Sequence, residues 1–226
     1  MKTVLITGIG QGIGKALANT FLEKGFFVIG TSTTGAVDFE HENLSVQQLD
    51  LSSPASIEKC ANAIKSLDKK IDILINNAGV LLDGNEEILV PAKLRDTLEV
   101  NLIGTADFTE HLLNEMEPSG HVIFISSTAG SIDYAEKLVS HEPLHYPAYK
   151  ISKAALNMYM CTLAMRLKQN GSNLIISAIH PGWVKTKIGG DDADLTPEQS
   201  ADGIYQFAVT SPESGHFWFK GEKLPW

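Results

Sequence analysis

The chain has 226 residues, of which 43% are hydrophobic and 20% charged, and its formal net charge is −9. Length and composition suit one globular domain with a sizeable core, spanning residues 1–226. The acidic balance argues against nucleic acid or an anionic membrane as a partner, and no apolar run reaches the ~18 residues of a membrane span. The two cysteines, Cys60 and Cys161, form no spaced motif, so the sequence predicts neither a disulfide framework nor a metal site. Because glycines follow the amino terminus too early for a signal peptide, we expect a cytoplasmic protein.

Short apolar runs alternate with longer helical stretches along the chain. Strands are predicted at 3–8, 26–30, 44–50, 71–79, 121–127 and 174–182, with an added edge strand at 217–221. Helices are predicted at 12–24, 54–68, 92–116 and 147–169. Runs that are apolar on both faces and separated by helices are typical of βαβ units. The sequence therefore predicts an α/β fold built on a parallel sheet.

A glycine-rich turn, TGIGQGIG, lies between the first predicted strand and the first predicted helix. It does not match G-x-G-x-x-G, but it matches T-G-x-x-x-G-x-G through Thr7, Gly8, Gly12 and Gly14. Glycine lets the backbone approach a pyrophosphate closely, and a helix N-terminus offers free N–H groups to the anion. A tight turn without a ligand would not need four glycines in seven residues. The pattern and its place predict a dinucleotide site.

The stretch YPAYKISKAAL contains two tyrosine–lysine pairs at a spacing of four, Tyr146/Lys150 and Tyr149/Lys153. A residue before proline is pushed out of the helical region, and Pro147 suits the first position of a helix. Tyr146 is therefore predicted to lie outside the helix, where its pairing with Lys150 loses the one-turn geometry. Lys153 interrupts an otherwise apolar helix face, which is costly unless the ammonium has partners. A nearby ammonium lowers the pKa of a tyrosine from about 10, so we predict that Tyr149 and Lys153 form a proton-transfer pair.

Motifs in this order resemble the short-chain dehydrogenase/reductase family over essentially the whole chain. They are the glycine-rich turn, NNAG at 76–79, Asn101, Ser127, Tyr149 with Lys153, and HPGWVKT at 180–186. The segments PGWVKTKIGG and GHFWFKGEKLPW are similar in particular to sniffer-type and C-factor-type carbonyl reductases. The resemblance implies a single-domain Rossmann-type, doubly wound parallel sheet with helices on both faces. It also implies hydride transfer between NADP(H) and a small carbonyl or alcohol.

The resemblance assigns roles to four residues. Tyr149 would exchange a proton with the carbonyl or alcohol oxygen, and Lys153 would lower its pKa and hydrogen-bond the nicotinamide ribose. Ser127 would hold the substrate oxygen, although Ser126 is adjacent and only alignment with the family separates the two. Asn101 would support a water that leads protons to Lys153.

The family's cofactor contacts carry over to a larger set of residues. They are Gly8, Gln11, Gly12, Ile13, Gly14, Ser32, Thr33, Asp50, Leu51, Asn77, Ala78, Gly79, Tyr149, Lys153, Val184 and Thr186. Selectivity depends on the end of the second strand, where an acid binds the ribose 2′-OH of NAD and its absence favours NADP. Ser32 and Thr33 stand there, with no carboxylate and no arginine. We predict NADP(H), with NAD(H) as the alternative.

Substrate and assembly are less constrained. The loop 187–196 carries basic charge only at Lys187, so a small neutral ketone, aldehyde or quinone is expected. The interval between Ser127 and Tyr149 exceeds the family's, and the extra segment 131–145 could shape the pocket or cover a subunit face. Family members commonly pair through the helices beginning near 92 and 147, so a homo-oligomer (dimer or tetramer) is expected. The alternative function is a nucleotide-binding sensor or developmental signalling protein that does not depend on turnover, although such proteins usually lack the tyrosine–lysine pair.

Overall fold

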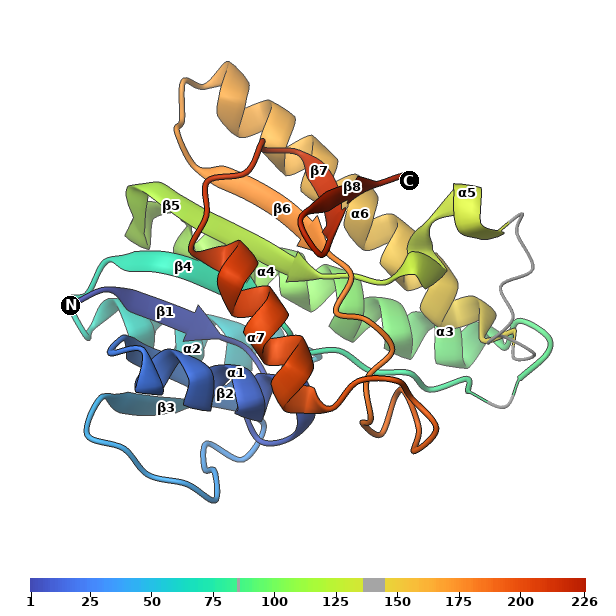
Figure 1. Ribbon diagram of the computed structural model, residues 1–226, viewed down its shortest axis with the longest axis horizontal. Coiled ribbons are helices and arrows are strands. Elements are labelled where there is room, and N and C mark those ends of the chain that lie inside the picture. Colours follow the sequence, from blue (N-terminus) through green and yellow to red (C-terminus); the bar gives the residue numbers. More distant parts are fainter. Residues whose placement is uncertain (85, 136–144) are drawn as a thin grey trace.

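A single sheet organises the molecule. The computed structural model describes residues 1–84, 86–135 and 145–226, in which eight strands pair in the order β3-β2-β1-β4-β5-β6-β7-β8 (Figure 1). The strands are β1 (Thr3–Ile6), β2 (Phe27–Ser32), β3 (Leu44–Gln48), β4 (Ile71–Asn76), β5 (Met116–Ile125), β6 (Ile175–Ile179), β7 (His216–Phe219) and β8 (Glu222–Leu224). Neighbouring strands run parallel except β7 and β8, which form an antiparallel pair. The predicted α/β class is confirmed.

Helices cover both faces of this sheet. The principal helices are α1 (Gly12–Glu23), α2 (Pro54–Lys65), α3 (Pro91–Leu98), α4 (Thr105–Leu112), α6 (Pro147–Gln169) and α7 (Pro197–Ala208), with a short α5 (Ile132–Ala135). One buried cluster joins α1 and α7 to the sheet, and a second joins α2, α4 and α6 to the opposite face (Figure 1). Alternate strand residues feed the two clusters, since Leu5 and Leu74 lie in one and Val4 and Ile73 in the other. The doubly wound arrangement is thereby confirmed.

The predicted single helix over 92–116 is wrong. α3 ends at Leu98, a π-helical turn spans Glu99–Gly104, α4 follows, and a 3-10 turn (Leu113–Glu115) leads into β5, which already begins at Met116. The π turn coincides with a close packing point, because a Cβ on Gly104 would lie 1.9 Å from the backbone oxygen of Leu51. Such single-turn insertions in helices are frequent at functional sites.

The carboxyl-terminal part also differs from the expectation. α7 was not anticipated, although Thr196 and Gln199 form a capping box at its start and Pro197 occupies its first turn. The strand expected at 217–221 is found at His216–Phe219, but it is not the sheet edge, because β8 pairs outside it.

The parallel strands place their carboxyl ends along one edge of the sheet, on the side of Figure 1 where α5 lies. Ligands of open α/β sheets bind beyond that edge. Within the described residues, no helix has both the length and the apolar character needed to cross a membrane.

Candidate active site

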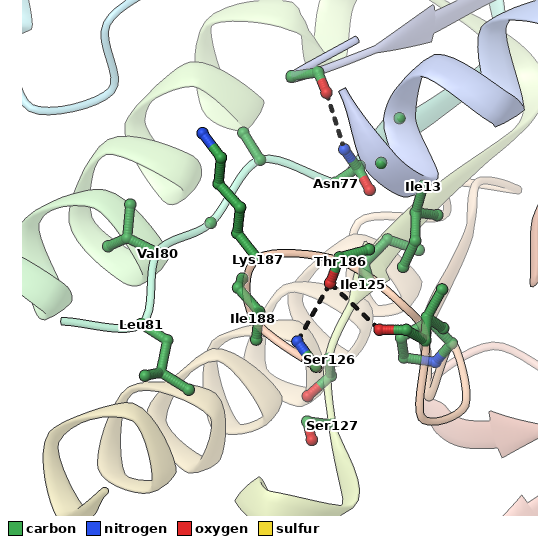
Figure 2. A pocket seen from close by; sticks show the side chains of 18 of the residues that line it. Ile13, Asn77, Val80, Leu81, Ile125, Ser126, Ser127, Thr186, Lys187 and Ile188 are labelled. Atoms are coloured by element: carbon green, nitrogen blue, oxygen red, sulfur yellow. Dashed lines mark hydrogen bonds between the residues drawn. The ribbon is translucent and has the colours of Figure 1, made fainter. Parts of the chain in front are cut away.

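A cleft of about 1760 Å³ opens along the carboxyl ends of the strands. The loops that follow β1, β2, β3, β4, β5 and β6 line it, together with the start of α6. Every residue predicted for the site contributes to its lining except Asn101, which is not among the described lining residues. Figure 2 shows Ile13 and Asn77 on one part of the wall and Thr186, Lys187 and Ile188 on the opposing loop.

The glycine-rich turn forms one wall of this cleft. Gly8 has φ +75° and Gly12 φ +56°, values that other residues rarely adopt. A Cβ on Gly14 would lie 2.1 Å from the oxygen of Gly8, so no side chain fits there. α1 begins at Gly12 with no acidic residue in its first turn. The turn therefore presents bare backbone and a helix N-terminus to the cleft, which is what a pyrophosphate requires.

Asn77 holds this turn against the loop after β4. Its side-chain nitrogen donates to the oxygens of Thr7 (2.9 Å) and Gly8 (3.2 Å), and Figure 2 shows it at the start of α1. The hydroxyl of Thr7 in turn accepts from the backbone N–H groups of Asn77 and Ala78, both at 3.0 Å. These bonds join the glycine-rich turn to the loop after β4.

The region after β2 corrects part of the argument on cofactor selectivity. Ser32 is buried, and its hydroxyl donates to the oxygen of Ala36 at 2.9 Å. A carboxylate does line the cleft here, since Asp38 lies among the lining residues and forms an ion pair with Lys15 at 2.8 Å. The bond from Lys15 holds the pKa of Asp38 below its usual value. Lys15 and Asp38 lie outside the end of β2, so the residues at the strand end alone do not reveal them.

Lys153 lies beneath Tyr149 in the middle of the cleft. Its ammonium donates to the oxygen of Ile125 at 2.8 Å and lies 5.6 Å from the centre of the Tyr149 ring. Only 4% of Lys153 is exposed, and burial lowers its pKa to about 8. A charged group this deep in the fold is expensive, as the sequence pattern had indicated.

Tyr146 lies outside the helix, as predicted. It has φ 22°, and α6 begins at Pro147. Tyr146 and Lys150 still lie close together, because the Lys150 ammonium is 5.0 Å from the centre of the Tyr146 ring. That contact uses the face of the ring, as in a cation–π pair.

The two adjacent serines after β5 differ in their surroundings. The hydroxyl of Ser126 is buried and donates to Asn157 at 2.6 Å. The hydroxyl of Ser127 accepts from the N–H of Ala129 at 3.1 Å and borders the cleft (Figure 2). Both serines line the cleft, but the hydroxyl of Ser126 is already bonded to Asn157, so Ser127 is the better candidate for contact with a substrate.

Asn101 is buried in the π turn behind the cleft. Its side-chain oxygen accepts from the N–H of Val80 at 2.8 Å, and its nitrogen donates to the oxygen of Val80 at 2.8 Å and to the hydroxyl of Ser152 at 3.0 Å. In the described residues it therefore connects the loop after β4 to α6.

The loop after β6 forms another wall of the cleft. The hydroxyl of Thr186 donates to the oxygen of Val184 at 3.3 Å and accepts from the N–H of Gly189 at 3.2 Å (Figure 2). Trp183 also lines the cleft, and its indole N–H donates to the oxygen of Gly189 at 2.7 Å. These bonds fold the loop into a compact turn.

The carboxyl-terminal residues also contribute to the wall of the cleft, and no sequence motif indicates this contribution. Phe219 and Leu224 line the cleft. The N–H of Asp133 donates to the oxygen of Trp226 at 3.0 Å, and the hydroxyl of Ser131 donates to the oxygen of Pro225 at 3.0 Å. The extra segment predicted at 131–145 is thus attached to the tail at its beginning, while residues 136–144 lie outside the described residues.

Comparisons with known proteins agree with this geometry. Mouse "Carbonyl reductase [NADPH] 1" is 26% identical over 98% of this chain and 97% of its own. The NADPH-bound carbonyl reductase from chicken fatty liver superposes with a TM-score of 0.88 at 28% identity, covering 100% of this chain and 99% of that chain. The carbonyl reductase Sniffer of D. melanogaster gives 0.84 at 25% identity, covering 100% of both chains, which confirms the expected likeness to sniffer-type reductases. A family model described as short chain dehydrogenase matches residues 2–195, and the chain therefore belongs to the short-chain dehydrogenase family of oxidoreductases.

Proposed function

We propose that the protein is a carbonyl reductase that uses NADP(H) and acts on a small carbonyl or alcohol. The observation that carries the proposal is the pairing of Tyr149 with a buried ammonium, Lys153, in a cleft walled by the glycine-rich turn. Two of the similar proteins are named for NADPH, which supports this cofactor. NAD(H) is the alternative, since the carboxylate of Asp38 lines the cleft in the segment that follows β2.

The residues present fit a dinucleotide. The free N–H groups at the start of α1 and the bare surface of Gly12 and Gly14 would receive the pyrophosphate. Asp50 and Leu51 would receive the adenine, Asn77 to Gly79 its ribose, and Val184 with Thr186 the carboxamide and the pyrophosphate. When bound, the reduced cofactor supplies the hydride.

The proton is handled by residues of the chain. In the reducing direction, the phenol of Tyr149 gives its proton to the substrate oxygen, and the Lys153 ammonium favours the phenolate that remains. The hydroxyl of Ser127 donates a hydrogen bond to the same oxygen. Asn101 supports the water path to Lys153 from behind the cleft, where its amide fixes the backbone of Val80.

Substrate, assembly and location are further parts of the proposal. The loop 187–196, in which Lys187 is the one basic residue, favours a small neutral ketone, aldehyde or quinone over a phosphate-bearing substrate. A homo-oligomer is supported by exposed methionines on α6, Met158 at 68% and Met165 at 58%. We also propose a cytoplasmic location.

The proposed function is tested with Tyr149→Phe and its neighbour Tyr146→Phe as the matched control. Fluorescence titration with NADPH and NADH is followed by turnover on a panel of carbonyls. Loss of the acid should lower kcat of Tyr149→Phe at least ~100-fold with NADPH binding retained, while Tyr146→Phe keeps most of its activity.

Equal turnover by wild type and Tyr149→Phe would remove the catalytic assignment. Equal losses in both variants would contradict the assignment of the proton transfer to Tyr149 and Lys153. NADPH binding without turnover of any carbonyl in the panel would favour a sensor on the same fold.

A further inference from the structure

The catalytic helix α6 lacks a local acceptor at its start. Its N-cap residue, Tyr146, is not one of the short polar types that cap helices, and its first turn contains no acidic residue. Pro147 has no N–H, so the first amide of the helix that needs an acceptor is that of Ala148. This amide directly precedes Tyr149.

Asp83 supplies that acceptor from a distant part of the chain. Its Oδ2 accepts from the N–H of Ala148 at 2.6 Å, across 65 positions of sequence. Only 1% of Asp83 is exposed, and its Oδ1 is buried without a hydrogen-bond partner among the described residues. A buried carboxylate with one unpartnered oxygen costs stability, so its presence calls for an explanation.

Asp83 belongs to the loop after β4 that carries the cofactor-facing residues Asn77 to Gly79. In that loop, Asn101 bonds both the N–H and the C=O of Val80. Asn101 also donates to Ser152, and the hydroxyl of Ser152 donates to the oxygen of Tyr149 at 2.7 Å. One loop is therefore tied to α6 on either side of the Tyr149 backbone, through Asp83 before it and through Asn101 after it.

We infer that Asp83 is a positioning residue for Tyr149, which it holds in register with the loop that receives the cofactor. This inference rests on the proposed function of Tyr149. Asp83 lies beneath the cleft and is not among its described lining residues, so it acts through the helix start and touches neither substrate nor cofactor. A displacement of about 1 Å at a reacting group can cost ~100-fold in rate, so even partial loosening is measurable.

The test uses Asp83→Ala and Asp83→Asn, with Asp72→Ala as the matched control. Asp72 makes the same kind of bond, since its Oδ2 accepts from the N–H of Thr3 at 2.7 Å, but it lies at the amino end of the sheet. When kcat is normalised to the concentration of NADPH-binding sites, the kcat of Asp83→Ala should be about tenfold below that of wild type. KM and the Kd for NADPH should each change less than about twofold. Asp83→Asn keeps an oxygen acceptor and should restore kcat to within about threefold of wild type, whereas Asp72→Ala should lower stability and leave kcat unchanged.

Amide exchange at Ala148 gives a readout that does not depend on turnover. Exchange should accelerate in Asp83→Ala and stay at the wild-type rate in Asp72→Ala. If Asp83→Ala does not fold, Asp83→Glu carries the test, because the longer side chain displaces the helix start and should lower kcat with KM unchanged.

An unchanged kcat with unchanged exchange in the folded Asp83 variants would overturn the inference, as would a loss of kcat in Asp72→Ala of the same size. If wild type showed no Tyr149-dependent turnover, the proposed function would fail, and exchange at Ala148 would still decide whether Asp83 fixes the start of α6.

Discussion

At the scale of one residue, the buried ammonium of Lys153, which the proposed chemistry needs, lowers the free energy of unfolding. Among the described residues its ammonium has one hydrogen-bond acceptor, the oxygen of Ile125, and its pKa falls from 10.5 to about 8 because burial penalises the charge. The folded state thus binds this proton less tightly than the unfolded chain does. Between about pH 8 and 10.5 the unfolded state carries the extra proton, so the contribution of Lys153 to the free energy of unfolding rises with pH in that window.

Lys153→Met should therefore stabilise the cofactor-free protein near pH 7 while it abolishes turnover. The substitution removes a desolvation cost of the order of 3 kcal/mol. It also leaves the Ile125 oxygen without its donor, which lowers the free energy of unfolding by about 1 kcal/mol and offsets part of the gain. Thermal unfolding should show the gain over wild type at pH 7 and a smaller gain at pH 10. A lower Tm for Lys153→Met at pH 7 would mean that the charge is better solvated than its burial indicates.

Gly14→Ala should damage cofactor binding through the backbone alone. The new Cβ would lie 2.1 Å from the Gly8 oxygen and 2.5 Å from Asn77 Nδ2, so the turn must open. We expect loss of NADPH binding by titration together with a lower Tm. The control is Gly203→Ala in α7, where a Cβ meets no atom within 4 Å, and alanine should raise stability by up to ~1 kcal/mol. Unimpaired binding by Gly14→Ala would place the pyrophosphate elsewhere.

At the scale of elements, local rules could be read from the sequence and long-range contacts could not. The start of α6 was predictable because proline restricts its own φ and that of Tyr146. The π turn was not, because it depends on Gly104 meeting the Leu51 backbone, which is far away in sequence. For the same reason the sequence could not reveal the bond of Asp83 to α6 or the reach of Asp38 into the cleft. α7 is different, because its capping box, formed by Thr196 and Gln199, is a local pattern that indicates a helix start from the sequence alone.

α6 also carries an exposed apolar stripe. Ile151, Met158 and Met165 recur every seven residues and are 42%, 68% and 58% exposed. Such a stripe on a helix is suited to burial against a second copy of the chain.

We expect that wild type is a dimer or tetramer by light scattering and that Met158→Glu with Met165→Glu shifts it to a smaller species. The control is Val209→Glu, which places the same charge on another exposed apolar residue, at the end of α7. A monomeric wild type would remove the oligomer from the proposal.

At the scale of the whole molecule, the sheet separates two cores, and the cleft runs along the edge where both meet. Segments from β1 to β8 contribute to the cleft, so a bound dinucleotide would connect parts of the chain that are otherwise joined only through the sheet. Binding to the folded state alone stabilises it by mass action.

NADPH at about 100 times its Kd should raise the free energy of unfolding by ~2.7 kcal/mol, which for a chain of this size is a rise in Tm of roughly 5–10 °C. NADH at the same concentration should give a smaller rise. A larger shift with NADH would reverse the assigned preference and point to Asp38 as a ligand of the ribose 2′-OH.

The bonds that join the carboxyl-terminal residues to the segment after Ser127 affect how the protein can be handled. A purification tag fused after Trp226 would begin at the carbonyl group that accepts a hydrogen bond from the N–H of Asp133, next to the cleft. Met1 is 75% exposed and lies at the opposite end of the strands (Figure 1). An amino-terminal tag leaves the cleft untouched, whereas kinetic constants from a carboxyl-terminal fusion would describe an altered pocket.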